Sequence, residues 1–504
     1  MPAATARPLP RASRAMDDDA FWRPGGVAMA AFLLLFVAAW TAFGSLAFAG
    51  KALHGDVAEA YAWGREFRLG YNQHPPFWAW IAGGWFLVFP RQDWAFNLLA
   101  VVNAAAGLCG AWRLIGLFVH GPRRMAAFLL LLLTPFYTFL CFKYNANTIF
   151  LSLWPWTLFF FVRCLERQRR ADAVWFGVML GLSFLSKYYA IVLAGTCFAA
   201  SLTHPRRATY WRSALPWISG AVCFLVFLPH LLWLISTTAP PVEYAESLVG
   251  RGWAKALTYA ASFIVAAAAY QAAVLAVIAA AAWRAPPQPA RVERLPMLAA
   301  LVLAPVGLTV LFGLALQLKI STNMALGTFP LAPVLLLELV PRADPRRVAR
   351  IAAAAAAAVT LVPLLAAYWL APVMMRRDSD PAEREPRREL AEVATRLWHE
   401  RIGTRLRLVA GTDPFENSIS FYSQDAPSSF IGFSYVKAPW ASPQRIARDG
   451  LLAACRSGDG ACLQAAARFA TPRTERVQVT LVHRFRGEEA APMTFDLFLI
   501  PPSG

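Results

Sequence analysis

Charged residues are scarce in this chain: Asp, Glu, Lys and Arg together make up 15% of its 504 residues, whereas 58% of the residues are hydrophobic. Apolar runs recur through roughly the first 370 positions, which excludes a soluble globular protein and indicates an integral membrane protein. The formal net charge of +18 would suggest a nucleic-acid partner for a soluble protein. Here the arginines lie mostly in short loops between apolar runs, and no basic stripe interleaved with aromatic residues is present, so the sequence argues against nucleic-acid binding.

Lysine is especially scarce, with six residues against 42 arginines. If the N-terminus is cytoplasmic, every predicted inner loop is rich in arginine and all the lysines fall on the predicted outer side. Lysine carries a compact point charge that suits phosphate, so this segregation indicates that some of the lysines serve a binding site. The alternative for any single lysine is a side chain that snorkels to the membrane surface. The residues are Lys51, Lys143, Lys187, Lys255, Lys319 and Lys437.

Eleven apolar segments, each of about 15 to 25 residues, predict an α-helical integral membrane protein with about 11 transmembrane helices. We interpret the first segment as a retained span, because its apolar stretch is longer than the core of a normal signal peptide; the alternative is cleavage after Ala47-Phe48-Ala49. The predicted organisation is a cytoplasmic N-terminal tail (1–26), a multi-spanning domain (27–372) with a first outer loop (50–93), and a soluble domain (373–504). The segments are 27–49, 95–118, 125–142, 148–165, 173–186, 189–203, 214–236, 256–283, 297–317, 325–340 and 350–371.

The composition changes abruptly at Arg376-Arg377-Asp378, and the polar tail of roughly 125 residues that follows predicts a separate small α/β domain. An odd number of spans puts this domain outside the cytoplasm, in the periplasm of a bacterial cell. The pattern predicts helices over about 382–400 and 443–455, and strands over 405–410, 418–422, 476–483 and 494–500.

The cysteines divide into two groups. Five of the seven lie in apolar spans, where a small buried hydrophobic residue is the default interpretation. Cys455 and Cys462 differ because they flank a turn-forming insert, Arg-Ser-Gly-Asp-Gly-Ala, in the polar tail. An oxidising compartment would favour a disulfide between them. A zinc site would need a matching second pair of Cys or His, and none stands nearby.

The first outer loop carries two carboxylates, Asp56 and Glu59, in a segment that predicts a short helix beginning near Asp56. Three positions apart on a helix, both would share a face. A carboxylate at a low-dielectric interface can act as a general base toward an acceptor hydroxyl or amine, although Asp56 could also simply cap the helix. His74 precedes Pro75 and Pro76, which fix the backbone, so its imidazole either binds a phosphate from a rigid turn or is an ordinary loop histidine.

Three further outer junctions each combine one lysine with hydrogen-bonding side chains. Lys143 is followed by Asn145 and Asn147, Lys187 is followed by two tyrosines, and a polar run after Lys319 ends at Asn323. Together these junctions could surround an anionic headgroup while the apolar spans hold its lipid tail.

Four motifs carry a family resemblance: Asp-x-x-Glu-Ala-Tyr at 56–61, Gly-Tyr-x-x-His-Pro-Pro at 70–76, Lys-x-Asn-Ala-Asn at 143–147 and Leu-Ser-Lys at 185–187. Over about residues 27–340 the chain resembles the polyprenol-phosphate-sugar-dependent glycosyltransferases of family 39 and their aminoarabinose-transferase relatives, which have a multi-spanning C-type architecture. Relatives often have Lys-Pro-Pro where His74 precedes the prolines here. The aminoarabinose type also has an acidic residue near the second outer junction, where this chain has asparagines.

The resemblance implies a C-type glycosyltransferase in which Asp56 is the acidic active-site residue and Glu59 is a second candidate carboxylate. It implies transfer of a sugar from a polyprenyl-phosphate donor to a lipid, glycan or protein acceptor on the periplasmic face of the bacterial inner membrane. Lysines would neutralise the leaving phosphate while Asp56 deprotonates the acceptor. Donor phosphate-binding roles map to His74, Lys143, Lys187 and Lys319, and supporting roles map to Tyr61, Tyr71, Asn145, Asn147 and Asn323.

The sequence reveals no required cofactor; Asp56 and Glu59 could hold a divalent metal weakly, but two carboxylates alone make an incomplete site. No nucleotide-binding glycine loop is visible, in keeping with a lipid-linked donor and not a nucleotide sugar. Two alternative functions remain open. A lipid-linked sugar flippase or transporter would require ionisable residues or broken helices near the middle of the membrane. A membrane-anchored envelope-assembly protein would depend on its outer tail, residues 376–504.

Overall fold

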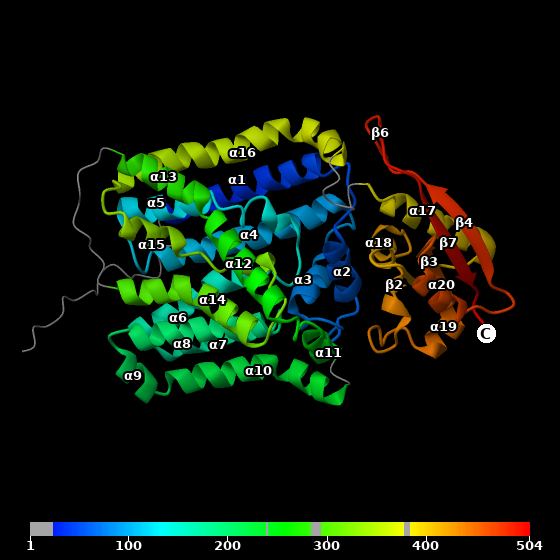
Figure 1. The fold of residues 1–504 in the computed structure, drawn as a ribbon, viewed down its shortest axis with the longest axis horizontal. Coiled ribbons are helices and arrows are strands. Elements are labelled where there is room, and N and C mark those ends of the chain that lie inside the picture. The colour runs from blue at the N-terminus through cyan, green and yellow to red at the C-terminus, as the bar shows by residue number, and fades with distance from the viewer. Residues whose placement is uncertain (1–23, 238–239, 284–293, 377–383, 504) are drawn as a thin grey trace, which may run out of the picture.

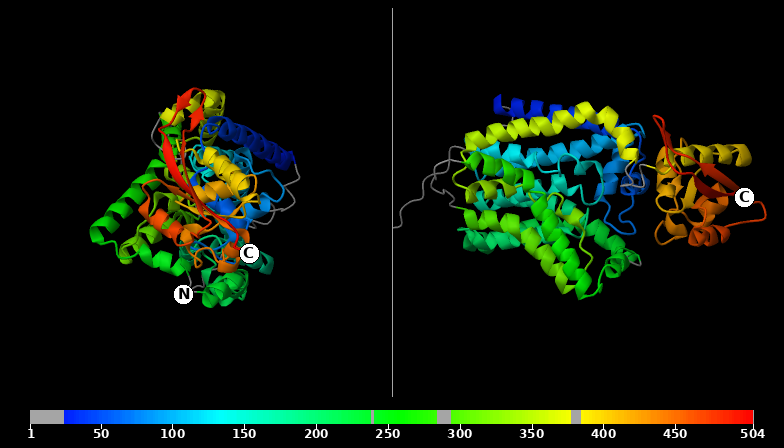
Figure 2. Two further views of the ribbon diagram at one scale, coloured as in Figure 1. Left: turned by 90° about the vertical axis from the view of Figure 1, so that its right-hand side faces the viewer. Right: turned by 45° about the horizontal axis from the view of Figure 1, so that its top comes forward.

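The computed structural model describes residues 24–237, 240–283, 294–376 and 384–503. It consists of a long helix bundle and, at one end of the bundle, a smaller domain built on a β-sheet (Figure 1; Figure 2). The predicted fold class, a helical membrane protein with a small C-terminal α/β domain, is therefore confirmed. Most of the predicted N-terminal tail (1–26) and residues 377–383 of the predicted soluble domain (373–504) lie outside the described residues.

The bundle and the loops at its ends contain most of the helices. Their bounds are α1 (Pro24–Ala47), α2 (Gly55–Gly64), α3 (Phe77–Trp85), α4 (Asp93–Ile115), α5 (Gly121–Leu131), η2 (Leu140–Phe142), α6 (Phe150–Arg167), α7 (Arg170–Phe184), α8 (Ala190–Thr203), α9 (Arg207–Arg212), α10 (Leu215–Ser236), α11 (Pro240–Ser247), α12 (Trp253–Ala269), α13 (Ala272–Ala282), α14 (Leu295–Ala315), η3 (Thr322–Ala325), α15 (Ala332–Leu339) and α16 (Pro345–Arg376).

Five described helices, α1, α4, α10, α14 and α16, are long and apolar enough to cross a membrane. The pair α12 and α13 is bent by 43° and makes a sixth span if it crosses as one unit. The five long helices run along the long axis of the bundle (Figure 1), as parallel spans would. The predicted number of eleven spans is not confirmed.

Two predicted spans are interrupted by proline or glycine. In segment 125–142, α5 ends at Leu131, shortly before Pro135, and proline disfavours helix at the residue that precedes it. In segment 325–340 only α15 is helical, because Gly327 has a φ of +85°, a conformation that residues with a Cβ rarely adopt. The carbonyl oxygen of Phe150 would lie 2.6 Å from a Cβ at this position, so the chain also passes too close for any other residue.

The tail domain is a five-stranded sheet with the strand order β2-β1-β3-β7-β4, packed with helices. Strand β1 (Leu408–Gly411) pairs in parallel with β2 (Ser428–Ser429) and β3 (Leu451–Arg456), whereas β7 (Met493–Ile500) is antiparallel to β3 and β4 (Glu475–Leu481). Strand β1 is buried throughout and edge strand β4 alternates in exposure, as their positions require. The remaining elements are α17 (Arg387–Ile402), α18 (Phe415–Tyr422), η5 (Ile431–Phe433), α19 (Pro443–Asp449), α20 (Gly460–Ala467), β5 (Arg484–Phe485) and β6 (Glu488–Glu489).

Two predicted elements of the tail are wrong. Segment 418–422, predicted as a strand, belongs to helix α18. The apolar residues Phe415, Ile419 and Tyr422 of this helix are spaced by the helical repeat. The predicted helix over 443–455 ends at Asp449, because Gly450 has a φ of +73° and terminates it. The residues after Gly450 form the central strand β3.

Cys455 at the end of β3 and Cys462 in α20 are joined by a disulfide, with their Cα atoms 5.6 Å apart. The insert between them is ordered by Asp459, whose side chain accepts a hydrogen bond from the backbone N–H of Cys462 at 3.1 Å and caps α20.

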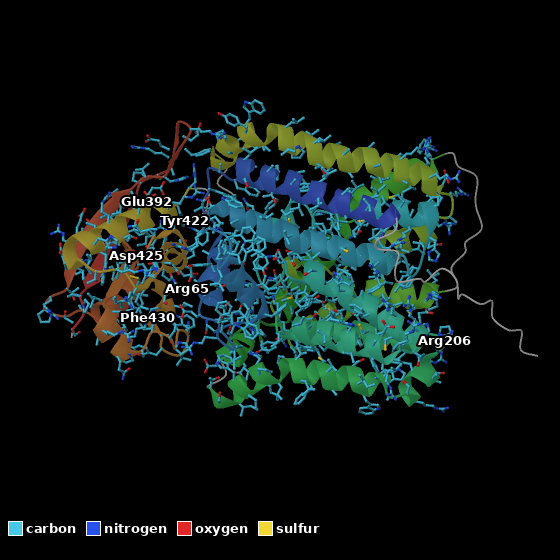
Figure 3. The ribbon with its side chains drawn as sticks, turned by 180° about the vertical axis from the view of Figure 1, so that it is seen from behind. Arg65, Arg206, Glu392, Tyr422, Asp425 and Phe430 are labelled. Carbon is cyan, nitrogen blue, oxygen red and sulfur yellow. A yellow bond between two sulfur atoms is a disulfide. The ribbon has the colours of Figure 1, made fainter. Side chains whose placement is uncertain are left out.

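The tail domain rests on the first outer loop, at the end of the bundle opposite to Arg206 (Figure 3). The contacts run in both directions: Arg91 of the loop donates to the carbonyls of Phe421 (2.9 Å) and Ser423 (2.6 Å), and Arg387 of the tail donates to the carbonyl of Leu53 (2.7 Å). Arg206 belongs to a predicted inner loop, and the tail domain is predicted to lie on the outer side. The two are found at opposite ends of the bundle, as the sequence predicts. Which end is cytoplasmic stays a prediction.

Candidate active site

Helix α2 presents Asp56 at its first turn. His54 is the N-cap residue, and its Nδ1 accepts the backbone N–H of Asp56 at 3.2 Å. The Asp56 side chain remains 42% exposed, with Oδ2 lying 3.3 Å from Nζ of Lys143 and Oδ1 lying 3.5 Å from Nδ1 of His54. Burial favours the protonated form, but Lys143, His54 and a hydrogen bond from Asn145 outweigh it and lower the pKa of Asp56. Asp56 is therefore a carboxylate at neutral pH.

Asn145 holds this carboxylate in a defined orientation. Its Nδ2 donates to Oδ2 of Asp56 at 2.9 Å. Its Oδ1 accepts the backbone N–H groups of Asn147 at 2.8 Å and Thr148 at 3.2 Å. Because backbone amides only donate, the amide oxygen must face its own turn and the amide nitrogen must face Asp56.

Asn147 contacts Lys187 through its amide oxygen. Nζ of Lys187 donates to Oδ1 of Asn147 at 2.5 Å. Lys187 lies between α7 and α8. Burial lowers the pKa of Lys187 to about 8, although the charge of Asp56 opposes the shift. The ammonium thus stays predominantly charged at neutral pH.

Two hydrogen bonds fix the start of α3 against these junctions. The backbone N–H of Phe77 donates to the carbonyl of Leu185 at 2.8 Å, and the Tyr144 hydroxyl donates to the carbonyl of Trp78 at 2.9 Å. They bring His74, just before α3, close to Lys187. Burial, together with the charge of Lys187, lowers the pKa of His74 to about 3, so its imidazole is neutral and offers a phosphate a hydrogen bond without a charge.

Glu59 lies one helical turn after Asp56, and its pKa shifts in the opposite direction. Burial, with the charges of Asp56, Asp413 and Glu416, raises the pKa of Glu59 well above its usual value. The last two residues belong to the tail domain, which therefore places carboxyl groups beside this site, and burial raises the pKa of Glu416 itself to about 8. The environment separates the two carboxyl groups of α2 into one that is ionised and one that holds its proton more tightly.

A polar cavity of about 320 Å³ brings most of the predicted residues together. It adjoins an apolar cavity of about 360 Å³ between α8, α11 and α14. The two share a boundary that includes His74, Lys187, Tyr244 and Lys319. The polar cavity is lined by Asp56, Glu59, Gln73, His74, Trp78, Asn145, Ala146, Asn147, Lys187, Tyr244, Leu248, Lys319, Ser321 and Met324.

A third cavity of about 180 Å³ lies on the other side of Asn145, with Lys51, His54 and Lys143 in its wall. Asn323, predicted as a supporting residue, lines this cavity and does not line the polar one. Asp56 thus lines the polar cavity. Its partner Lys143 lines the third cavity, and Asn145 lines both.

Tyr61 and Tyr71 are buried in packing and line none of these three cavities. The ring of Tyr61 packs edge-on against Phe421 of the tail domain, with centroids 5.3 Å apart. Tyr71 stacks on Trp63, with centroids 5.2 Å apart. In the structure, both tyrosines therefore serve to pack the first outer loop.

Sequence reasoning missed several wall residues, chiefly Gln73 and Tyr244. Gln73 precedes His74 and could have been included with it. Tyr244 belongs to α11, a short helix in an outer connection, and its ring lies edge-on to His74 with centroids 6.1 Å apart. Its only signal was its position between two apolar segments. Within the described ranges, no group of three or more His, Cys, Asp or Glu side chains could hold a metal ion.

Comparison with known proteins supports the resemblance. Residues 73–233 match the model of the family described as dolichyl-phosphate-mannose-protein mannosyltransferase. The fold is similar to that of ArnT from Cupriavidus metallidurans bound to undecaprenyl phosphate, with a TM-score of 0.59 and 16% identity over 94% of this chain and 98% of that chain. The apo state of ArnT gives a TM-score of 0.60 and 14% identity over the same shares. A search of curated proteins gives no match.

Proposed function

We propose that the protein is a membrane glycosyltransferase that moves a sugar from a polyprenyl-phosphate donor to an acceptor on the periplasmic face of the inner membrane. The observation that carries the proposal is the joined pair of cavities. Lys187 and Lys319 stand where the polar cavity meets the apolar one. A phosphate at these lysines would direct its sugar toward Asp56 and its lipid chain into the apolar cavity. The ArnT structure with undecaprenyl phosphate supports this choice of donor.

In the proposed reaction, Asp56 accepts the proton of an acceptor hydroxyl or amine as that group attacks the anomeric carbon of the sugar. The bond from this carbon to the phosphate oxygen breaks, and the phosphate leaves with the electron pair. Lys187 and Lys319 stabilise its negative charge. Lys143 and Asn145 keep Asp56 ionised and oriented between turnovers, and His74 supplies a neutral hydrogen bond to the donor.

The transporter alternative has one supporting observation, the 43° bend between α12 and α13. Broken helices are typical of transport sites at mid-membrane. The ionisable residues of the site, however, come from loops and junctions at the end of the bundle that faces the tail domain, as expected for a reaction at the membrane surface. Transport is therefore the second candidate function, behind the glycosyltransferase.

The test uses purified protein in proteoliposomes. Lys187→Ala and Lys319→Ala are each expected to weaken undecaprenyl-phosphate binding by about 10- to 100-fold, the contribution of a hydrogen bond between charged groups. Lys255→Ala is the matched control, because Lys255 is an exposed lysine on α12 outside the cavities.

Function is measured as release of undecaprenyl phosphate from a labelled undecaprenyl-phosphate sugar in the presence of an envelope extract. Release that requires the native protein supports the proposal. Movement of the intact donor between leaflets without release would favour the transporter, and neither activity would favour an envelope-assembly role.

A further inference from the structure

The seven-residue connection between α1 and α2 depends on the tail domain for its backbone hydrogen bonds. The connection runs from Phe48 to His54 and leads directly into the helix that carries Asp56. Buried backbone groups must be paired, and a connection without secondary structure needs partners from elsewhere. Four carbonyls here accept hydrogen bonds from tail residues: those of Ala49, Gly50, Lys51 and Leu53.

Leu53 is held most completely, because both of its backbone polar groups are bonded to tail side chains. Its N–H donates to the hydroxyl of Tyr422 at 2.7 Å, and its carbonyl accepts from Nη1 of Arg387 at 2.7 Å. Arg387 is only 3% exposed and is itself fixed by Glu385, whose Oε2 accepts from its Nε at 2.7 Å. The attachment is therefore rigid on the tail side.

Asp56 lies three residues after Leu53, and its carboxylate contacts Asn145 and Lys143 of the bundle. The first turn of α2 is thus held between the tail domain at Leu53 and the bundle at Asn145. A displacement of about 1 Å at a reacting group can lower turnover by about 10²-fold, so the attachment at Leu53 bears directly on the site.

We propose that the tail domain is a positioning domain for the first outer loop, in which Tyr422 and Arg387 hold Leu53 so that Asp56 meets Asn145 and Lys143. The proposal rests on the proposed function for its effect on turnover. It also makes a physical claim that does not depend on activity: the backbone at Leu53 is ordered by the Tyr422 hydroxyl.

The first experiment measures hydrogen exchange by mass spectrometry on the full-length protein. Tyr422→Phe removes the hydroxyl that accepts the Leu53 N–H and that also contacts Asp93 and Arg388, and is expected to raise exchange in peptides covering residues 49–58. Tyr435→Phe is the matched control, because Tyr435 is an exposed tyrosine of the same domain whose ring packs against Phe430 of that domain. Unchanged exchange in Tyr422→Phe would overturn the proposal, whether or not the protein is active.

The second experiment measures sugar transfer. Tyr422→Phe is expected to lower kcat by about tenfold or more while the affinity for undecaprenyl phosphate stays within about twofold, because the donor lysines lie on other junctions. The acidic limb of the pH profile should move to higher pH as Asp56 loses its alignment with Lys143. A loss of folded protein would lower kcat without moving this limb.

The outcomes separate the two proposals. Increased exchange with unchanged kcat and an unchanged acidic limb would overturn the positioning role while leaving the proposed function intact. Absence of turnover in the native protein would overturn the proposed function, and the exchange experiment would still decide whether the tail orders the loop.

Discussion

Asn145 donates a hydrogen bond to Asp56, at 2.9 Å, with an orientation that its own turn enforces. The relationship matters because an acidic side chain at this position would have the opposite effect on Asp56. A carboxylate in place of Asn145 would repel Asp56, whereas the amide supports its ionised form. The ionised form of Asp56 is therefore supported by the amide of Asn145 and the ammonium of Lys143.

We expect Asn145→Asp to move the acidic limb of the pH profile of kcat/KM upward by a unit or more, because two adjacent carboxyl groups cannot both ionise readily. Asn145→Ala removes the hydrogen bond without adding a charge and should cause a smaller shift in the same direction. The measurement is sugar transfer between about pH 4 and pH 8. An acidic limb that stays in place in Asn145→Asp would contradict the arrangement.

Asp56→Asn should lower turnover by about 10² to 10⁴, because the amide keeps the shape of the side chain but cannot accept a proton. Donor binding should persist. Glu59→Gln is the matched comparison: the raised pKa of Glu59 favours its neutral form, which glutamine imitates, so turnover should fall much less. Equal losses in the two variants would show that the two carboxyl groups do not have separate roles.

His483 should make docking of the tail domain depend on pH. Its Nε2 donates to the carbonyl of Gly50 at 2.6 Å and its Nδ1 donates to Glu389 at 2.7 Å, so both ring nitrogens carry protons. The hydrogen bond to Glu389 raises the pKa of His483 against burial and the charge of Arg388. Its stabilisation is thus fully present below the unfolded pKa of about 6.5 and is lost as pH rises through the higher folded pKa.

The check for His483 is the difference in thermal stability between the native protein and His483→Gln as a function of pH. We expect the largest difference near pH 6, where Glu389 is still ionised because its own pKa is lowered. The difference should shrink toward alkaline pH. A difference that grows with rising pH would rule out the charged form of His483.

The disulfide between Cys455 and Cys462 should appear in mass spectra of non-reduced peptides from protein purified without reductant. Its removal by Cys455→Ser with Cys462→Ser should destabilise the tail by about 2 kcal/mol, the value for a short loop. Two freely alkylated thiols in the native protein would count against both the bond and the predicted oxidising compartment.

The predicted topology can be tested with single cysteines at Glu392 and Arg346, both exposed side chains. Glu392 belongs to the tail domain (Figure 3). An impermeant thiol reagent added to intact spheroplasts should label Glu392→Cys and should label Arg346→Cys only after the membrane is opened. The reverse pattern would invert the orientation.

The sequence by itself determined the class of the protein and the local elements that carry the chemistry. Apolar runs separated by arginine-rich loops are a one-dimensional pattern, and so is the short helix that begins after His54. Both are fixed by neighbours a few residues away, which is why they could be read directly. The same reasoning failed at 125–142 and 418–422, although both carry a local signal: Pro135 interrupts the first segment, and Phe415, Ile419 and Tyr422 follow the helical repeat across the second.

Tertiary structure alone decided which residues meet and in what charge state. Asn145 lies 89 positions from Asp56, and Leu53 lies 369 positions from Tyr422. Their contacts depend on how distant elements pack. The neutral state of His74 and the packing roles of Tyr61 and Tyr71 also follow from burial, which no spacing reports. A motif specifies the side chains available, whereas distance and burial, which set electrostatic energies and pKa values, exist only in the folded protein.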